Sequence, residues 1–491
     1  MTIFSILATL CLIPVIFGSV YALLCMVTGW HFSTSHSTDS QKTFSKWPAV
    51  TILKPICGLE KNLRTNLRTT CEQDYPILQV VLSVQSPNDP AIPLLYEIQR
   101  EFGRKRVTVA IEDCPAGPNP KINNLIGGLK HARHDLLIIS DSDIQLRPDY
   151  VKTIIGPLAD PEVGFVCTLY KGIQARTWWE KMELLTINTE LIPNMMFALV
   201  TGASQFCVGA STALRRSTLN DIGGLPSLAN YLVEDYEMGR RIWMKGQRMV
   251  ILPYLVETVI DLPTPRKWWH HLIRWDQCQR AARPLALLST ILIKPIPFAC
   301  FYALFSLGTT SGLLVVALTV AIRLLTAGII LRWNLQDREG LFSLWLLPFR
   351  DIAALVSWGL AFTKETTVWR HSTCILTTQG HLVDTVKTEQ VDASFPFTGK
   401  GASTQVIPVK NEKPDDHSST YSFHTPISHL SSSRQQNAKE PFREHHARNT
   451  TSFEGTQLHT GEVEGNSGKL PKESSILQYS PVNIWNIKGT S

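Results

Sequence analysis

Two aspartates, Asp141 and Asp143, directly follow the apolar run "DLLIIS". The run is typical of a buried strand, so both acids are expected at the carboxyl edge of a sheet, where α/β proteins bind their ligands. Two carboxylates at this spacing can share a hard divalent cation, and Mg²⁺ or Mn²⁺ normally keeps substrate phosphate oxygens among its other ligands. A capped turn followed by a solvated acid would give the same pattern, so the rest of the chain must decide.

A second acidic pair, Glu234 and Asp235, precedes a helical pattern in "LVEDYEMGRR". By itself Asp235 suits the N-cap of this helix, because a carboxylate there accepts hydrogen bonds from backbone N–H groups. The pair becomes a candidate for chemistry only through its place among the other polar motifs.

An aromatic and basic segment, "HHLIRWDQCQRAARP", follows. Apolar and aromatic residues recur in it at intervals of three and four, which predicts an amphipathic helix over residues 266–284 that lies in the membrane interface. Its arginines Arg274, Arg280 and Arg283 would be free to meet phosphate. Anchoring to lipid alone is the simpler interpretation. It does not exclude catalysis, since a lipid acceptor would enter beside such a helix.

The order of these motifs carries more information than each one alone. An acid at Asp89, then "DSD", "VEDY" and "IRW", resembles the processive-type family of inverting glycosyltransferases. The chain is most similar to the ceramide glucosyltransferases and their bacterial hopanoid-associated relatives. The resemblance covers roughly residues 1–380, and its further blocks, in the family's order, are "LKPICGLE", "CEQDYP", "VVLSVQSPNDPAI", "NPKINNL" and "FCVGAS".

The resemblance implies a Rossmann-like nucleotide-diphospho-sugar transferase (GT-A) domain that binds a UDP-sugar. Asp89 would then lie near the uracil and Lys121 near the diphosphate. Asp141 would face the nucleotide ribose and share Mn²⁺ or Mg²⁺ with Asp143. Of these two acids, Asp143 is preferred as the metal ligand because it lies further from the strand.

The resemblance also implies the acceptor side of the site. Asp235 would be the general base, and Arg274 with Trp275 would help to hold the diphosphate and the acceptor. In a single inverting displacement, the base takes the proton of the acceptor hydroxyl while the oxygen attacks the anomeric carbon.

Three further residues are candidates for the substrate pocket. Cys207 matches a cysteine near the pocket of the family, although a buried thiol in the core is an equal alternative. Glu234 adjoins the expected base. His271 stands where the family's Q/RxxRW motif has Gln or Arg, so the partner of the motif's Arg and Trp differs here.

Alternating strand and helix patterns must position these residues. The runs "AVTIL", "LQVVLSV", "VTVAI" and "DLLIIS" predict strands, and "PAIPLLYEIQREFG" and "KINNLIGGLKHA" predict helices between them. Apolar strands that alternate with helices imply a mostly parallel sheet covered on both faces. We expect the α/β transferase domain to span residues 48–265.

Apolar segments flank this domain. Residues 1–30 include a long uncharged stretch that is long enough to cross a membrane and lacks the basic start of a signal peptide. Residues 285–363 form a second membrane region, whose first segment is broken by Lys294, Pro295 and Pro297 and could be re-entrant. The apolar segments together predict a multi-pass membrane protein. Lysines follow the first segment, so the positive-inside rule predicts that the catalytic domain faces the cytoplasm.

Composition excludes some classes of function. A net charge of +6 is too weak to indicate nucleic-acid binding, and the ten scattered cysteines fit reduced thiols better than a zinc site or a disulfide framework. Residues 395–491 are rich in Ser, Thr, His and Gln, and they predict a disordered tail. The oligomeric state has no signature in the sequence.

The leading hypothesis is an enzyme that moves one hexose, glucose or N-acetylglucosamine, from a UDP-sugar to the hydroxyl of a ceramide- or hopanoid-like lipid. A processive polysaccharide synthase of the cellulose, chitin or hyaluronan type is the alternative within enzymes, but such synthases use more spans and an intact QxxRW motif. A catalytically silent membrane scaffold is the alternative of a different class.

Overall fold

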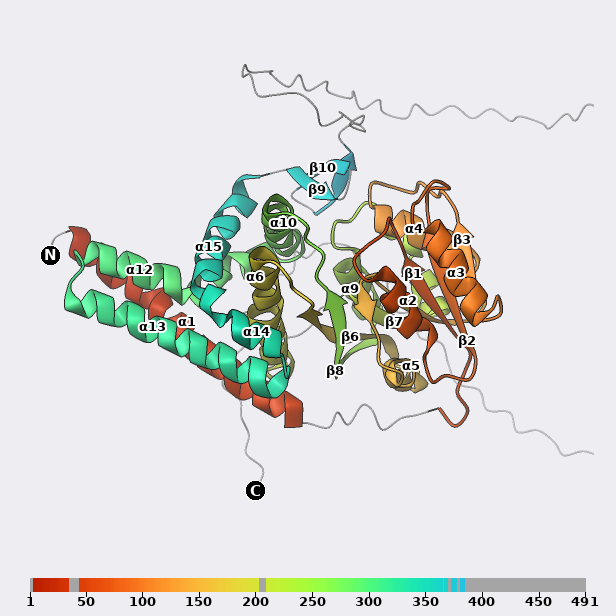
Figure 1. Ribbon diagram of the computed structural model, residues 1–491, viewed down its shortest axis with the longest axis horizontal. Coiled ribbons are helices and arrows are strands. Elements are labelled where there is room, and N and C mark those ends of the chain that lie inside the picture. The colour runs from red at the N-terminus through yellow and green to blue at the C-terminus, as the bar shows by residue number, and fades with distance from the viewer. Residues whose placement is uncertain are drawn as a thin grey trace, which may run out of the picture. The chain divides into compact units, whose positions relative to one another are not determined.

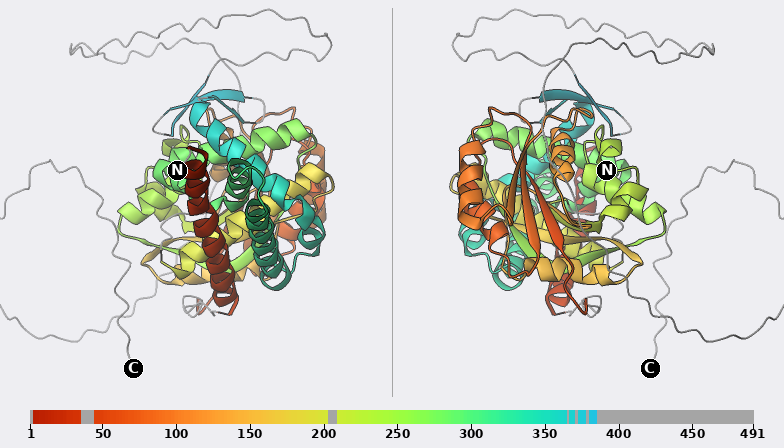
Figure 2. Two further views of the ribbon diagram at one scale, coloured as in Figure 1. Left: turned by 90° about the vertical axis from the view of Figure 1, so that its left-hand side faces the viewer. Right: turned by 90° about the vertical axis from the view of Figure 1, so that its right-hand side faces the viewer.

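The computed structural model describes residues 3–34, 44–202, 209–364, 366–369, 372–377 and 380–384 (Figure 1). The tail expected at 395–491 and the candidate Cys207 lie outside the described residues. The helices and strands gather into two parts, a sheet with its covering helices and a bundle of long apolar helices. Figure 2 shows the bundle nearest the viewer in its left view and the sheet in its right view.

The four strands expected from the apolar runs are present and parallel. Each is apolar enough to be buried on both faces, and the helices between them cover the sheet, so this half confirms the α/β class. The strands are β1 (Val50–Pro55), β2 (Leu78–Val84), β3 (Val107–Ile111) and β4 (Leu136–Ser140), and the helices are α2 (Leu63–Cys71), α3 (Ile92–Phe102) and α4 (Pro120–Lys130).

The other half makes the sheet mixed. The strand order is β3-β2-β1-β4-β7-β6-β8-β5, in which β6 and β8 pair in parallel, whereas β7 and β5 run antiparallel to their neighbours. These strands are β5 (Ile144–Gln145), β6 (Val163–Ile173), β7 (Ser211–Arg215) and β8 (Arg248–Val259). Because β5 pairs with the end of β8, the loop that carries Asp141 and Asp143 is held against β8.

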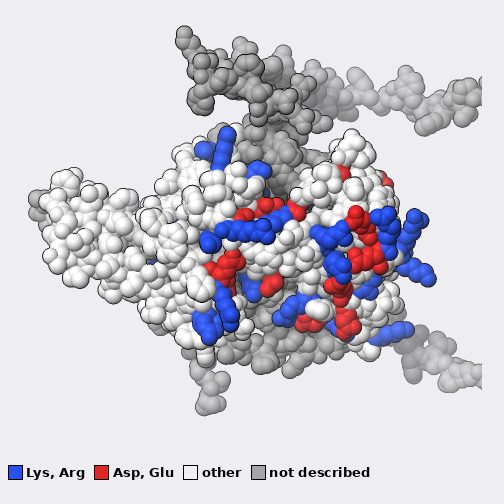
Figure 3. All heavy atoms as spheres, in the orientation of Figure 1, with Lys and Arg blue, Asp and Glu red and all other residues white. Residues whose placement is uncertain are grey.

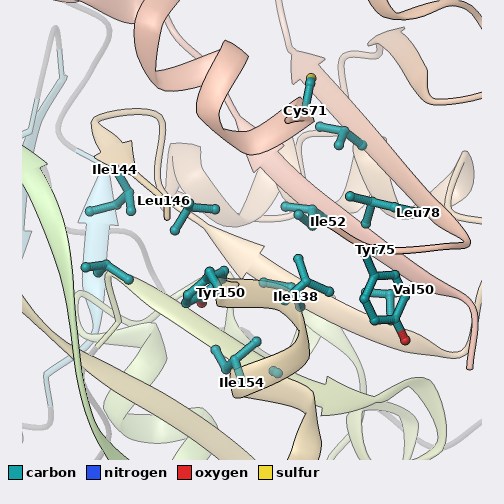
Figure 4. Close-up of a cluster of buried hydrophobic side chains, with 14 of the residues drawn as sticks. Val50, Ile52, Cys71, Tyr75, Leu78, Ile138, Ile144, Leu146, Tyr150 and Ile154 are labelled. Carbon is teal, nitrogen blue, oxygen red and sulfur yellow. The ribbon is translucent and has the colours of Figure 1, made fainter. Parts of the chain in front are cut away.

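Two apolar cores hold the sheet. One contains Ile52 and Ile138 from the central strands together with Tyr150 and Ile154 from α5 (Tyr150–Ile155), as Figure 4 shows. The other lies on the opposite face and includes Leu53, Leu137 and residues of α4, α8 (Arg216–Asp221) and α9 (Glu234–Met244). Burial on both faces fixes where the ends of β4 and α9 lie.

Two helical segments join the sheet to the apolar bundle. The first runs through α6 (Trp178–Thr186), the π-helical turn η3 (Ile187–Leu191) and α7 (Ile192–Val200); the second is α10 (Pro265–Ala282). Figure 1 shows α6, α10 and α15 (Leu347–Thr363) between the sheet and the bundle of α1 (Ile3–Thr34), α12 (Pro295–Phe305) and α13 (Thr310–Ile329).

Three helical stretches are long and apolar enough to cross a membrane: Ile3–Phe32, Thr310–Asn334 and Arg338–Thr363. A fourth candidate is the pair Pro284–Ile293 and Pro295–Phe305, which is bent by 54° at Lys294, where the sequence predicted a break. The surface over α12 and α13, at the left of Figure 3, is nearly free of charged side chains, which gather over the sheet half. The described chain is therefore built as a membrane protein.

A small antiparallel sheet near the end of the described chain was not expected from the sequence. It has the order β11-β10-β9, with β9 (Thr366–Trp369), β10 (Ser372–Leu376) and β11 (Leu382–Asp384). Its strands are too short to show a clear alternation of apolar and polar residues, so the sequence did not predict them.

Candidate active site

The "DSD" loop emerges from β4 at the carboxyl edge of the sheet. Oδ2 of Asp143 accepts a hydrogen bond of 3.0 Å from Oγ1 of Thr258 on β8, and the Asp143 carbonyl accepts one of 3.0 Å from Val259. Its other carboxylate oxygen, Oδ1, is buried without a hydrogen-bond partner among the described residues. Asp143 is thus fixed in place with one acceptor left open.

Electrostatics at this loop favour a cation. Burial, and then the nearby carboxylates of Asp141 and Glu60, raise the pKa of Asp143 to about 7, against the lowering effects of Thr258 and Lys54. No group of three or more His, Cys, Asp or Glu side chains among the described residues is arranged to enclose a metal. The donor set instead fits Mn²⁺ or Mg²⁺ held by one or two carboxylates, with phosphate oxygens of a substrate completing the shell.

Lys121, at the start of α4, joins the two acidic motifs. Its ammonium lies 2.8 Å from Oδ1 of Asp141 and 3.0 Å from Oε1 of Glu234. Burial by itself would lower the pKa of Lys121, but the carboxylates around it raise that pKa well above the usual value. The side chain is therefore a fixed positive charge between the end of β4 and the start of α9.

The "NPKINNL" block explains how Lys121 reaches this position. Asn119 caps α4 by accepting hydrogen bonds from the N–H groups of Lys121 and Ile122, and a proline occupies the first helical turn. The amide nitrogen of Asn119 donates to the carbonyl of Tyr231 and, at 3.2 Å, to Oε2 of Glu234. One asparagine thus ties the start of α4 to the loop before α9.

Asp235 is the second residue of α9, which begins at Glu234, so it does not occupy the N-cap. Its carboxylate accepts a 2.8 Å hydrogen bond from the N–H of Tyr236. Burial, and then the charge of Glu234, raise the pKa of Asp235 to about 6, against the lowering effect of Lys121. A Cβ atom at Gly209 would overlap the Asp235 carboxylate, so glycine leaves room for it. A carboxylate with this pKa is suited to accept a proton near neutral pH.

The middle of α10 lies beside the start of α9. Burial raises the pKa of the Cys278 thiol to about 12; Arg274, one turn earlier, lowers it, and Asp235 raises it. The charges of Arg274 and Asp235 thus both act on the Cys278 thiol. Arg274 is partly buried and supplies positive charge on the α10 side of the site.

His271 connects Trp275 to a buried acid. Nε1 of Trp275 donates a 2.9 Å hydrogen bond to Nε2 of His271, so the proton of the neutral ring resides on Nδ1. That nitrogen faces Oε1 of Glu183 on α6 at 3.2 Å, off the line of an ideal hydrogen bond. Trp275 also packs edge-on against Tyr170, with ring centroids 6.4 Å apart. His271 therefore orients the tryptophan of the "IRW" motif.

We expect His271→Gln to keep most of the activity and His271→Ala to lower it about ten- to hundredfold. A glutamine amide can accept from Trp275 and donate to Glu183, whereas alanine leaves both groups unpaired, at about 1–3 kcal/mol for a buried polar group. Steady-state transfer kinetics of the two variants test this. Equal losses in both would show that the histidine has a role that an amide does not replace.

The small C-terminal sheet closes over this part of the site. The N–H of Leu232 donates to the carbonyl of Gly380, and the N–H of Leu382 donates to the carbonyl of Asn230, at 3.2 and 2.8 Å. The side chain of Gln277 on α10 donates to the carbonyls of Lys364 and Thr366. Leu232, Cys374, Leu376 and Leu382 form a separate apolar cluster there. The segment joins α10 to the loop that leads into Asp235.

Comparison with known proteins assigns this arrangement to a family. The model described as "Glycosyl transferase family 21" matches residues 10–382, which is more than half of the chain. The chain belongs to Glycosyl transferase family 21. The match to family 21 begins in α1 and ends in β11, so it includes the helices and the small C-terminal sheet as well as the large sheet.

Two relatives in Caenorhabditis elegans show the range of similarity. Ceramide glucosyltransferase 1 is 26% identical over 289 residues, which cover 57% of this chain and 59% of that protein. Ceramide glucosyltransferase 3 is 24% identical over 356 residues, covering 70% and 76%. Among solved structures, a mannosyltransferase from Pyrobaculum calidifontis in complex with GDP-Man and Mn²⁺ aligns with a TM-score of 0.41 and 20% identity, over 71% of this chain and 98% of that one.

Three of the residues singled out in the sequence, Asp141, Glu234 and Asp235, come together around Lys121. Asp89 is used differently. Its carboxylate accepts hydrogen bonds from the N–H groups of Gly58, at 2.9 and 3.1 Å, and of Ala91, at 2.8 Å. It thereby fixes the loops after β1 and β2 to each other. A role near the base of a nucleotide stays a prediction for Asp89.

Sequence reasoning missed three residues of this site. Asn119 had a usable signal, because an asparagine before a proline commonly caps a helix. Glu183 had none, since a single acid in an amphipathic helix is ordinary. Tyr170 also had none; burial and then the carboxylates of Asp235 and Glu183 raise its pKa well above the usual value, so its phenol remains protonated and able to donate a hydrogen bond.

Proposed function

We propose that this family 21 protein is a membrane-bound inverting glycosyltransferase that moves one glucose from a UDP-sugar to the hydroxyl of a ceramide-like lipid. The observation that carries the proposal is the arrangement around Lys121. Its ammonium contacts Asp141 of the "DSD" loop on one side and Glu234 on the other, next to Asp235. In this proposal, the site for the leaving diphosphate and the site for the base share one partly buried cation, Lys121. The names of the relatives support glucose and ceramide.

In the proposed reaction the acceptor oxygen attacks the anomeric carbon from the face opposite the diphosphate. Asp235 takes the hydroxyl proton, the new bond from carbon to acceptor oxygen forms, and the bond from carbon to diphosphate oxygen breaks with its electron pair on UDP. Lys121 and Arg274 offer positive charge to the departing diphosphate. Mn²⁺ or Mg²⁺, when held by Asp143 and Asp141, would supply further charge neutralisation for that diphosphate.

The apolar helices next to the site support a lipid as the acceptor. Helix α10 carries Arg274 and Trp275, and the Trp275 ring packs against Tyr170 of the sheet. Its neighbour α15 belongs to a candidate span. In this proposal, the lipid hydroxyl reaches Asp235 at the membrane surface while the tails of the lipid stay in the bilayer. We further propose that the sheet domain faces the cytoplasm, as the lysines after α1 indicate.

The test uses membranes that carry the full chain, incubated with ceramide and labelled UDP-glucose or UDP-N-acetylglucosamine. We expect label in the lipid extract with UDP-glucose. Label in an insoluble polymer would instead identify a polysaccharide synthase. A silent scaffold would give neither product, and UDP with Mn²⁺ would not raise its Tm, whereas an enzyme is stabilised by binding its ligands.

A further inference from the structure

A second polar site lies among the apolar helices, apart from the "DSD" loop and Asp235. It is a cavity between α1, the π-helical turn η3, the break at Lys294, α13 and α15. Charged side chains within membrane helices are costly, so they usually serve a substrate path or a binding site. Its charged lining residues are Glu190, Lys294, Arg323, Arg350 and Asp351.

The two arginines of this cavity are fully engaged. Arg323 contacts Asp351 at 3.1 Å and donates to the carbonyl and hydroxyl of Thr189. Arg350 donates to Asp351 at 2.9 Å and also bonds Glu190. These bonds account for the packing of α13 and α15 against η3.

Lys294 is not engaged in this way. Its side chain is only 6% exposed, and its nearest acid is Oε1 of Glu190 at 3.6 Å, which is too far for a hydrogen bond. The ammonium has no hydrogen bond within the described ranges, although it lines the cavity. A buried ammonium with open donors is expensive unless a ligand or water satisfies it.

A bend between two helices and a close approach of α1 place Lys294 at the cavity. Lys294 stands at the 54° bend between two helices and directly precedes Pro295. A Cβ at Gly18 would lie 2.8 Å from Cδ of Pro295, so α1 can approach the bend only because residue 18 is glycine. Beside Lys294, Glu190 belongs to a π-helical turn, a distortion that is often found at functional sites.

The charges identify the class of ligand. Lys294 offers hydrogen-bond donors, and the neighbouring Glu190 offers a hydrogen-bond acceptor. A neutral ligand group with one acceptor and one donor can therefore bind to the two side chains together. The two arginines are already bonded to Glu190 and Asp351, so an anionic headgroup would find only the donors of Lys294, whose charge is offset by Glu190 at 3.6 Å. A secondary amide flanked by hydroxyls, on a lipid, has the required chemistry and can arrive between membrane helices.

We propose that this cavity binds the amide and hydroxyl head of the acceptor lipid, and this inference rests on the proposed function. Glu190 lies on the same continuous helical segment as Glu183, seven residues further on, or about 10 Å at ~1.5 Å per residue. Glu183 contacts His271 of the "IRW" helix, so Glu190 lies about two helical turns from a residue that contacts the proposed acceptor side of the active site. The lipid head is held there on its way to Asp235.

Lys294→Met should raise the KM for ceramide about ten- to hundredfold, the effect of losing one hydrogen bond to a charged group, with the KM for UDP-glucose unchanged. Lys294→Arg should restore much of the affinity, and Glu190→Gln should raise the ceramide KM less, since an amide can still accept. Lys105→Met, at an exposed position before β3, is the matched control. A ceramide KM in Lys294→Met equal to that of the control, or an equal rise in both KM values, would overturn the proposal.

A measurement without catalysis separates this inference from the proposed function. A ceramide analogue with a photoreactive group beside its amide is cross-linked to the wild-type full chain in membranes, without UDP-glucose, and the modified peptides are identified. Labelling of the segments around Glu190 and Lys294, reduced by excess ceramide but not by phosphatidylglycerol, supports the site even if no glucose transfer is found. Labelling elsewhere, or competition by phosphatidylglycerol alone, refutes it even if Lys294→Met does not fold.

Discussion

Asp235→Asn is expected to lower the rate of glucosyl transfer by about 10²- to 10⁴-fold, which is the usual contribution of a general base. Asparagine has the same shape and can still accept the hydrogen bond from Tyr236, but it cannot take the proton of the acceptor hydroxyl. The measurement is kcat with saturating ceramide and UDP-glucose in membranes that contain equal amounts of protein.

The pH profile gives an independent readout of the same residue. The base must be ionised to act, and the pKa of Asp235 is raised to about 6. The kcat/KM of the wild type should therefore fall about tenfold for each pH unit below about 6. The residual activity of Asp235→Asn should lack this acidic limb.

Stability separates a lost base from a damaged fold. Because the folded-state pKa of Asp235 lies above that of an unfolded aspartate, the stability linked to its protonation is present at low pH and is lost as the pH rises through about 6. Asparagine mimics the protonated form, so the variant should have a Tm at pH 7.5 at least equal to that of the wild type. Full turnover in this variant would remove Asp235 from the mechanism.

The second large effect is expected at the "DSD" loop, where Asp143→Ala should abolish the metal dependence of activity along with most of the activity. The open and buried Oδ1 of Asp143 is the acceptor best placed for a cation. In Asp141→Ala the response to Mn²⁺ should persist, because the main role of Asp141 is its contact with Lys121. Transfer rates after chelation and stepwise addition of Mn²⁺ measure both variants.

Asp135 offers a matched control on the same strand. Asp135 lies directly before β4, whereas Asp141 lies directly after β4. The side chain of Asp135 is 93% exposed. Asp135→Asn should behave as the wild type at every Mn²⁺ concentration. If Asp141→Ala rather than Asp143→Ala loses the Mn²⁺ response, the roles assigned to the two acids are exchanged.

The parts of the fold that follow from local pattern were predictable. Strands β1 to β4 are mostly apolar runs of five to seven residues with helices between them, so their pairing in parallel could be inferred. Strands β5 and β7 were not foreseen because they are short and pair antiparallel with partners distant in the sequence. Such pairing depends on contacts between distant segments, and the hydrophobic periodicity within one segment does not indicate its partner strand.

The site shows the same division. Asp141 and Asp143 were singled out because they follow a buried strand, and Asp235 because its motif occurs in the order that resembles the glycosyltransferases. Their roles stay predictions. The link that joins them was not foreseen, since nothing in "NPKINNL" shows that Lys121 spans from the "DSD" loop to Glu234. The His271 substitution was visible in the sequence, but its meaning needed Glu183, which comes from a helix almost ninety residues earlier.

The closure of the C-terminal sheet over residues 230–232 has a consequence for synthesis. During translation the large sheet, Asp235 and Arg274 emerge well before residues 364–384, so the loop beside the base is held on one side only until the last of these residues leaves the ribosome. In the proposed enzyme, the loop before Asp235 thus acquires these hydrogen bonds only after every candidate membrane span among the described residues has been translated.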